Sequence, residues 1–193
     1  MSHEGRVRTA PVERARRYAM VIDDRACLNC QACVVACKAE NSVPIGSHRN
    51  WVTEVEKGRF PFVSVQMEPG QCMQCENPPC VRVCPTGASF IDPDGIVLVN
   101  AADCIGCRYC IEACPYGARY FHEESGTVDK CTFCRHRLDQ GQEPACVVTC
   151  PTRARIFGDA DDPDSEVARA IARNRVEGRK EEAGTRPNVF YLS

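Results

Sequence analysis

Short stretches of alternating apolar and polar residues recur along this chain, and they predict short strands rather than long helices. Five apolar residues at 18–22 predict a first strand. Residues 51–56 and 62–67 both alternate, and Gly58 and Pro61 between them are typical of a turn. These two stretches therefore predict a hairpin, with its tryptophan packed in the core.

The second half of the chain repeats this pattern with stronger turn signals. Two further hairpins are predicted, from residues 88–91 with 96–99 and from residues 118–121 with 127–128. Asp-Pro-Asp-Gly closes the first and Ser-Gly closes the second, and these residues favour tight turns. A short strand is also predicted at 155–157.

Helical spacing is confined to two stretches. Residues 32–41 suit a short helix that ends near Pro44. Asp162 is predicted to cap a second helix with Pro163 at its first position. Apolar residues between 167 and 172 then form a packing stripe. The chain ends in a tail whose last apolar strand is expected to dock on the body.

Cysteines interrupt this pattern in four groups of four. The quartets are Cys27, Cys30, Cys33 and Cys37; Cys72, Cys75, Cys80 and Cys84; Cys104, Cys107, Cys110 and Cys114; and Cys131, Cys134, Cys146 and Cys150. All 16 cysteines of the chain belong to one of these quartets, so none is left over.

Three chemistries compete for these thiols. Disulfides account for an even number of cysteines, but not for the repeated spacing or for the proline after three of the four quartets. Structural zinc usually takes paired cysteines, often with histidine, whereas the four histidines here lie outside the quartets. Iron–sulfur clusters fit best, because Cys-x2-Cys-x2-Cys-x3-Cys-Pro is the bacterial ferredoxin run.

In such a run three thiolates hold one cluster and the fourth reaches a second cluster. The following proline biases the fourth cysteine away from helical geometry, which turns its thiol away from the first cluster. Clusters therefore come in close pairs, and four complete quartets predict four [4Fe–4S] clusters in a row that transfer electrons. The residues expected to exclude water from them are Leu28, Val34, Val35, Ile105, Ile111 and Val147.

Charge and hydropathy argue against a nucleic-acid partner, a membrane-spanning helix and a signal peptide. The formal net charge is −2 with neutral thiols. Four clusters with their thiolates add about −8, so the basic residues are needed for charge balance and no nucleic-acid partner is expected. No stretch approaches the ~20 apolar residues of a membrane helix. Arg16-Arg17 is followed by too short an apolar run for a signal peptide, and we expect a surface pair that leads into a strand.

Nothing in the sequence predicts a substrate site. No nucleophile stands with a base, and no Gly-rich phosphate loop is present, so no catalytic residue is assigned. The histidines at 48, 122 and 136 are expected at the surface or near ligands, and His3 lies in an Arg-rich arm. Lys130, Arg135 and Arg137 beside the fourth quartet are expected to balance cluster charge, to tune a cluster or to meet a partner.

The quartets and hairpins alternate as an internal repeat whose unit is half of a two-cluster ferredoxin. The turns Cys84-Pro-Thr-Gly-Ala88, Cys114-Pro-Tyr-Gly-Ala118 and Cys150-Pro-Thr-Arg-Ala154 repeat one another. The predicted fold class is therefore α+β, with two bacterial ferredoxin-like modules, β-hairpin insertions, and a C-terminal helix plus tail.

From about Tyr18 to its end, the chain resembles the four-cluster iron–sulfur subunits of molybdopterin oxidoreductases. The motifs that carry the resemblance are Cys27-Leu-Asn-Cys-Gln-Ala-Cys-Val-Val-Ala-Cys-Lys-Ala-Glu-Asn41, Cys75-Glu-Asn-Pro-Pro-Cys-Val-Arg-Val-Cys-Pro-Thr-Gly-Ala88, the Cys-Pro-Tyr-Gly-Ala118 turn and Lys130-Cys-Thr-Phe-Cys-Arg-His-Arg137. The compact length and the Gly184-Thr-Arg-Pro tail look most like the polysulfide or thiosulfate reductase type.

The resemblance implies how the quartets combine. Cluster one takes Cys27, Cys30, Cys33 and Cys150; cluster two takes Cys131, Cys134, Cys146 and Cys37; cluster three takes Cys104, Cys107, Cys110 and Cys84; cluster four takes Cys72, Cys75, Cys80 and Cys114. The implied segments are the arm (1–16), the first half of module one with quartet one (17–68), an inserted second module with quartets two and three (69–118), the second half of module one with quartet four (119–160), and the C-terminal helix and docking tail (161–193).

The resemblance also implies a non-catalytic, electron-transferring subunit with two partners. Cluster one would face a molybdopterin-containing catalytic subunit, and cluster four an integral-membrane quinone-binding subunit. The chain itself would not span the membrane and would be held there by its partners, on the outer face rather than the cytoplasmic one. There are two alternatives. One is a freestanding polyferredoxin carrier, and the other is the same row of four clusters carrying electrons outward from formate or quinol oxidation.

Overall fold

The computed structural model describes residues 16–192 of the chain. The expected Arg-rich arm, apart from Arg16, and His3 lie outside the described residues. Mixed helix and strand content, as predicted, is present throughout the described part.

Ten strands and six α-helices lie within residues 16–192. The strands are β1 (Tyr18–Asp23), β2 (Asn50–Arg59), β3 (Phe62–Gln71), β4 (Ser89–Ile91), β5 (Val97–Val99), β6 (Arg119–His122), β7 (Thr127–Lys130), β8 (Arg155–Asp159), β9 (Val176–Gly178) and β10 (Val189–Leu192). The α-helices are α1 (Ala32–Asn41), α2 (Pro79–Arg82), α3 (Tyr109–Glu112), α4 (Arg135–Leu138), α5 (Ala145–Val148) and α6 (Glu166–Arg173), and two 3-10 turns are η1 (Asp24–Ala26) and η2 (Glu181–Ala183).

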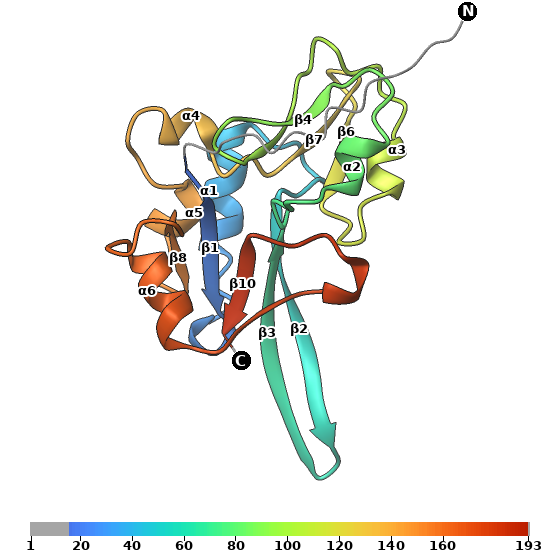
Figure 1. Cartoon of the computed structure of the whole chain (residues 1–193). Coiled ribbons are helices and arrows are strands. Elements are labelled where there is room, and N and C mark those ends of the chain that lie inside the picture. The colour runs from blue at the N-terminus through green and yellow to red at the C-terminus, as the bar shows by residue number, and fades with distance from the viewer. Residues whose placement is uncertain (1–15, 193) are drawn as a thin grey trace, which may run out of the picture.

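A four-stranded sheet joins the two ends of the described chain, in the order β8-β1-β10-β9. β1 runs parallel to β10, with Met20 opposite Val189, and antiparallel to β8, with Met20 also opposite Phe157. Figure 1 shows β1 and β10 side by side in the middle of the molecule. Because β1 leads into quartet one and β8 follows quartet four, the sheet brings those two quartets together.

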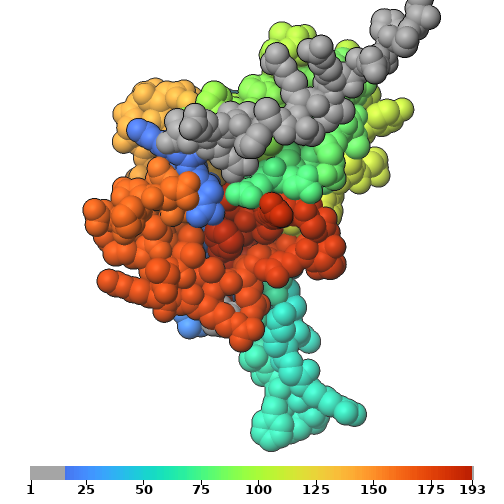
Figure 2. Space-filling model, viewed as in Figure 1, coloured from blue at the N-terminus to red at the C-terminus, as the bar shows by residue number. Residues whose placement is uncertain are grey.

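The hairpin of β2 and β3 is longer than the alternation predicted. Ten residue pairs join its strands, from Asn50 opposite Gln71 to Arg59 opposite Phe62. The hairpin projects well beyond the body of the molecule (Figures 1 and 2). At its base the Trp51 ring lies against Gly70, where an added Cβ would come within 2.4 Å of the ring. Glycine is therefore required at this position for the tryptophan to pack against the core.

Of the two smaller hairpins, β4–β5 lies between quartets two and three, and β6–β7 lies between quartets three and four. In the first turn, Asp92 accepts hydrogen bonds from the N–H groups of Asp94 at 3.0 Å and Ile96 at 2.8 Å. An aspartate that closes a turn on the backbone in this way is common in loops. Each turn returns the chain toward the next set of cysteines.

The main core contains cysteines alongside apolar side chains. Met20, Ile22, Ile96, Phe133 and Tyr191 pack in one cluster that also includes buried cysteines of quartets two and four. On the other face of the sheet, Ala19 and Val21 pack against Val167 of α6. The apolar core is thus built around thiols rather than beside them.

The C-terminal helix starts later than the sequence predicts. α6 begins at Glu166, and its N-cap is Ser165, whose Oγ accepts the Ala168 N–H at 3.0 Å. Asp162 accepts the Asp164 N–H in the preceding turn, at 2.9 Å, so the predicted capping role of Asp162 is wrong. Serine and aspartate are both good caps, and the turn geometry decides between them.

Replacing Ser165 with alanine should lower the free energy of unfolding by about 1 kcal/mol, because it removes the acceptor for the Ala168 N–H. The same hydroxyl donates to the Asp159 carbonyl at 2.6 Å, which adds to the loss. Anaerobic denaturant titration of the cluster-containing protein measures the change. Ser165→Thr is the matched control and should keep most of the stability; equal losses in both variants would show that the cap contributes nothing.

Candidate metal centres

Left-handed backbone residues shape the cysteine loops. Gln31 has φ of 61° directly before α1, and Arg108 has φ of 65° directly before α3. Gly106 has φ of 67°, and an added Cβ there would lie 2.5 Å from the Gly126 carbonyl oxygen. Only glycine fits so close to the β6–β7 turn. These reversals wrap the loops so that their thiols face a common space.

The structure contains four cavities, each lined by four cysteines. Site one is lined by Cys27, Cys30, Cys33 and Cys150; site two by Cys37, Cys131, Cys134 and Cys146; site three by Cys84, Cys104, Cys107 and Cys110; and site four by Cys72, Cys75, Cys80 and Cys114. Every set combines three cysteines of one quartet with the last cysteine of another. The structure therefore brings all 16 sequence-predicted ligands into four groups.

The four donor sets are alike, with four thiols each, and fit one repeated multi-iron group. Thiolates are the soft ligands that favour iron–sulfur clusters. In residues 16–192 no three His, Cys, Asp or Glu side chains converge closely enough to hold a single ion. The thiols instead surround a space, as four corners of a cluster require.

Burial makes several of these thiols hard to ionise without a cation. It raises the pKa of Cys37 and of Cys75 to about 12 and that of Cys146 to about 11. The pKa of Cys131 is raised well above its ordinary value for the same reason. Thiolates are the form that binds iron, and a bound iron cation stabilises the thiolate charge that burial disfavours.

The last cysteine of each quartet lines the site of another quartet, and two of these four cysteines are easier to ionise. Burial disfavours the Cys84 thiolate, but the Ser89 N–H and the Thr86 hydroxyl outweigh burial and lower its pKa. Cys150 has the same balance, because burial is outweighed chiefly by the Thr152 hydroxyl and the pKa is again lowered. The Cys-Pro-Thr turn therefore prepares its thiol as a ligand.

The sites lie in a row whose ends are at the surface. Cys30 of site one and Cys107 of site three are exposed. Cys33 of site one interacts electrostatically with Cys146 of site two, and Cys72 of site four does so with Cys131 of site two. Cys80 of site four packs with Cys104 and Cys110 of site three. The spatial order is therefore one, two, four, three. Site four is internal, and the expectation that cluster four meets a second partner is wrong in this arrangement.

The water-excluding role predicted for the residues between the cysteines holds only in part. Leu28, Val35 and Ile105 are more than half exposed, at 68%, 64% and 67%. Leu28 lines site one and Ile105 lines site three. Apolar side chains are thus left in water at the two ends of the row, where a partner could cover them.

The three basic residues beside quartet four have different surroundings. Lys130 is fully buried. Arg135 pairs with Asp92 and Asp94, both at 2.6 Å. Arg137 pairs with Glu40 at 3.0 Å. Only Lys130 lies deep among the cysteine sites.

The three histidines in the described part of the chain lie outside the linings of the four cysteine cavities. The side chain of His136 lies 2.7 Å from Glu40 at the surface. His48 and His122 are likewise absent from the cavity linings.

Sequence reasoning missed two buried arginines. Arg119 lines both site three and site four, and Arg155 lines site one. A signal was present, because each follows the alanine of a repeated Cys-Pro-x-x-Ala turn. Ser89 occupies the same position in the remaining copy. Aligning the internal repeat one residue further would have singled out these positions.

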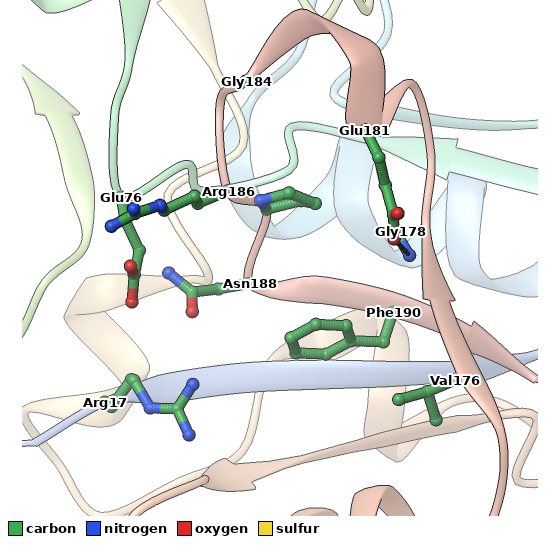
Figure 3. A pocket seen from close by; sticks show the side chains of 10 residues that line it. Arg17, Glu76, Val176, Gly178, Glu181, Gly184, Arg186, Asn188 and Phe190 are labelled. Atoms are coloured by element: carbon green, nitrogen blue, oxygen red, sulfur yellow. Dashed lines mark hydrogen bonds between the residues drawn. The ribbon is translucent and has the colours of Figure 1, made fainter.

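A larger cavity lies apart from the cysteines, with an empty volume of about 790 Å³. Arg17, Glu76, Arg186 and Phe190 are among its lining residues, and Figure 3 shows their side chains around it. Its lining carries both charge signs and no cysteine. Arg17 also pairs with Asp161 at 2.8 Å, so the Arg16-Arg17 pair leads into β1 from the surface.

Comparisons with known proteins agree with this site chemistry. Residues 26–89 and residues 63–160 match two family models, each described as a 4Fe-4S dicluster domain. A tetrathionate reductase subunit of Salmonella typhimurium is 46% identical over 98% of this chain and 75% of its own length. A polysulfide reductase chain of Wolinella succinogenes is 46% identical over 92% of this chain and 95% of its own length.

A selenate reductase subunit of Mesobacillus selenatarsenatis is 44% identical over 92% of this chain and 72% of its own length. Identity at this level, over most of both chains, shows common family membership. With four cysteine-lined cavities and two dicluster matches, the 16 cysteines account for four [4Fe–4S] clusters. The chain therefore belongs to the four-cluster iron–sulfur, electron-transferring subunits of the molybdopterin oxidoreductases.

Proposed function

We propose that this chain is a non-catalytic electron wire, with one cluster at each of sites one to four and the order one, two, four, three. The observation that carries the proposal is that each cavity is lined by three cysteines of one quartet and the last cysteine of another. The clusters held by these cysteines would supply one-electron transfer. The chain's own residues hold the four groups in a row and bury the inner two.

The proposed wire consists of two modules. Sites one and two share quartets one and four and form the first module, whereas sites three and four share quartets two and three and form a second module inserted into it. The pairing of β1 with β8 and β10 supports this division, because it joins the two halves of the first module. The segment boundaries expected from the sequence, 17–68, 69–118 and 119–160, follow the same division.

The two ends of the wire would meet different partners. Val52 of β2 and Pro69 of β3 line site one, so the base of the projecting hairpin lies at that end. We assign site one to a molybdopterin-containing catalytic subunit and site three to a quinone-binding membrane subunit. Within residues 16–192, no helix combines the length and hydropathy needed to cross a membrane. Partners would therefore hold the chain at the membrane, on its outer face.

The polysulfide, thiosulfate or tetrathionate type of reductase is the proposed setting. The similarity to polysulfide and tetrathionate reductase subunits over most of the chain supports it. The exposed apolar residues at both ends of the row argue against a freestanding polyferredoxin, because a soluble carrier has no need of two such ends.

Anaerobic purification from native membranes in mild detergent should yield this chain with a large subunit, a hydrophobic subunit, and molybdenum or tungsten. Metal analysis and subunit masses are the measurements, and about 16 irons per chain are expected. Iron and sulfide without a partner subunit would instead establish the polyferredoxin carrier. Dye-linked assays of the intact complex in both directions then distinguish polysulfide or tetrathionate reduction from the outward current of formate or quinol oxidation.

A further inference from the structure

Three cations are buried deep among the cysteine sites. Lys130, Arg155 and Arg119 are only 0%, 3% and 5% exposed. Burying a charge is costly unless another charge or a set of hydrogen bonds compensates for it. Among residues 16–192, no carboxylate forms an ion pair with any of the three.

Arg49 provides the contrast. It also lines a cysteine cavity, that of site two. Its guanidinium, however, donates to both carboxylate oxygens of Asp129, each at 2.9 Å. The charge of Arg49 is therefore neutralised within the protein. The hydrogen-bond acceptors of the other three cations are sulfur, carbonyl and amide groups, which carry no carboxylate charge.

Each of the three cations lies at a junction between neighbouring sites. Arg119 lines both site four and site three, and its Nη2 donates to the Cys80 sulfur at 2.9 Å. Arg155 lines site one and is the first residue of β8, which packs against α5, the helix that carries Cys146 of site two. The junctions four–three and one–two therefore each contain one arginine.

Lys130 occupies the remaining junction. It directly precedes Cys131 of site two, and its Nζ donates to the carbonyl of Cys131 and to that of Val97, which lines site four. The three junctions of the row thus each hold one cation.

The arginines also carry donors without a protein partner. Arg119 Nη1 and Arg155 Nη2 are buried and make no hydrogen bond, although each guanidinium also interacts with a thiol of its site, Cys110 and Cys33 respectively. Ser89, at the equivalent position of the internal repeat, has a buried Oγ with no partner either, and it lines site three. Unsatisfied buried donors are rare and call for an explanation. Three of them at one repeat position, beside cysteine cavities, indicate a common acceptor in those cavities.

We propose that Arg155, Lys130 and Arg119 are coupling charges, one at each junction, that stabilise the reduced form of the clusters on both sides. This proposal rests on the proposed ligand sets of the wire. Reduction adds a negative charge to each cluster, and neighbouring reduced clusters repel each other strongly in a low-dielectric interior. A fixed cation between two clusters lowers that repulsion and raises both potentials.

Arg119 offers the sharpest test, because it alone of the three lines two cavities. Arg119→Gln keeps a hydrogen-bond donor and removes the charge, and Arg119→Met removes both. In the intact complex, redox titration followed by electron paramagnetic resonance should show the clusters at sites four and three becoming harder to reduce. We expect at least a tenfold change in each reduction equilibrium, which is 59 mV for one electron. The clusters at sites one and two should stay unchanged.

Arg82→Met is the matched control. Arg82 follows Cys80 by two residues but is exposed, and it donates to Asn77 at 2.6 Å. Its removal deletes the same charge near the same ligand, outside the low-dielectric interior, and should leave all four potentials in place. An equal shift in Arg82→Met and Arg119→Gln would overturn the proposal.

Iron content separates the possible failures. Wild-type protein with far fewer than about 16 irons would contradict the proposed ligand sets themselves. Full iron with unchanged potentials in both Arg119 variants, or with one equal shift at all four sites, would overturn the coupling role alone. If neither Arg119 variant retains its clusters, Arg155→Gln decides: lowered potentials at sites one and two support the role, and unchanged ones overturn it.

Discussion

Alanine at position 114 should disrupt the cluster held by Cys72, Cys75 and Cys80, not the one held by the three cysteines that precede it in the chain. Cys114 lines site four, whereas Cys104, Cys107 and Cys110 line site three with Cys84. With three thiolates left, one iron of that cluster has no cysteine ligand and is readily lost, so iron should fall below the full complement of about 16. Electron transfer through the complex should drop severely, because the four sites lie in series.

Paired variants identify which cluster is affected. Cys75→Ala should alter the same electron paramagnetic resonance signal as Cys114→Ala, because both residues line site four. Cys107→Ala should alter a different signal, because this residue lines site three. If Cys114→Ala and Cys107→Ala affect one common signal, the fourth cysteine stays with its own run and the crossed arrangement is wrong.

Removing iron should abolish cooperative folding. Lys130, Gln71, Gln74 and Asn50 are among the largest fully buried side chains, and eight of the 16 cysteines are buried as well. Without clusters, the buried thiols would be neutral at pH 7, since burial raises the pKa of Cys37 and Cys75 to about 12. The buried cations would then have no counter-charge. Structural metal sites contribute on the order of 10 kcal/mol each to folding.

The measurement is near-ultraviolet circular dichroism of the tryptophan, followed during thermal unfolding before and after anaerobic chelation. The tryptophan signal and the sharp transition should both be lost, and added iron and sulfide should restore them. Protein incubated without chelator is the control. An iron-free chain that keeps its transition near the original temperature would show that the polypeptide core suffices alone.

Local expectations from the sequence compare well with the structure where a few neighbouring residues decide the outcome. The helix predicted at 32–41 is α1, with the same bounds. The Asp-Pro-Asp-Gly turn does close a hairpin, because Asp92 bonds to backbone groups within four residues. The predicted cap of α6 is wrong because Ser165 and Asp162 are both good caps, and the turn engages Asp162 while Ser165 bonds to the Asp159 carbonyl at the end of β8.

Expectations that depend on distant contacts compare less well. Leu28 and Ile105 are apolar residues beside cysteines, and the sequence predicts that they exclude water from the clusters. They are exposed because they lie at the ends of the row of sites. The internal repeat singles out the positions of Arg119 and Arg155, but it does not predict their burial, since an arginine in a strand is usually at the surface. Their burial follows from the packing of β6 and β8 against the cysteine loops.

The sequence by itself determined the number and chemistry of the sites, because thiol spacing within a dozen residues specifies the ligand type. The tertiary structure decided which thiols share a cavity, that site four is internal, and which cations lie between sites. These properties depend on pairings such as Met20 with Val189, which join residues at opposite ends of the chain. Local spacing carries no information about such pairings, and only the folded chain determines them.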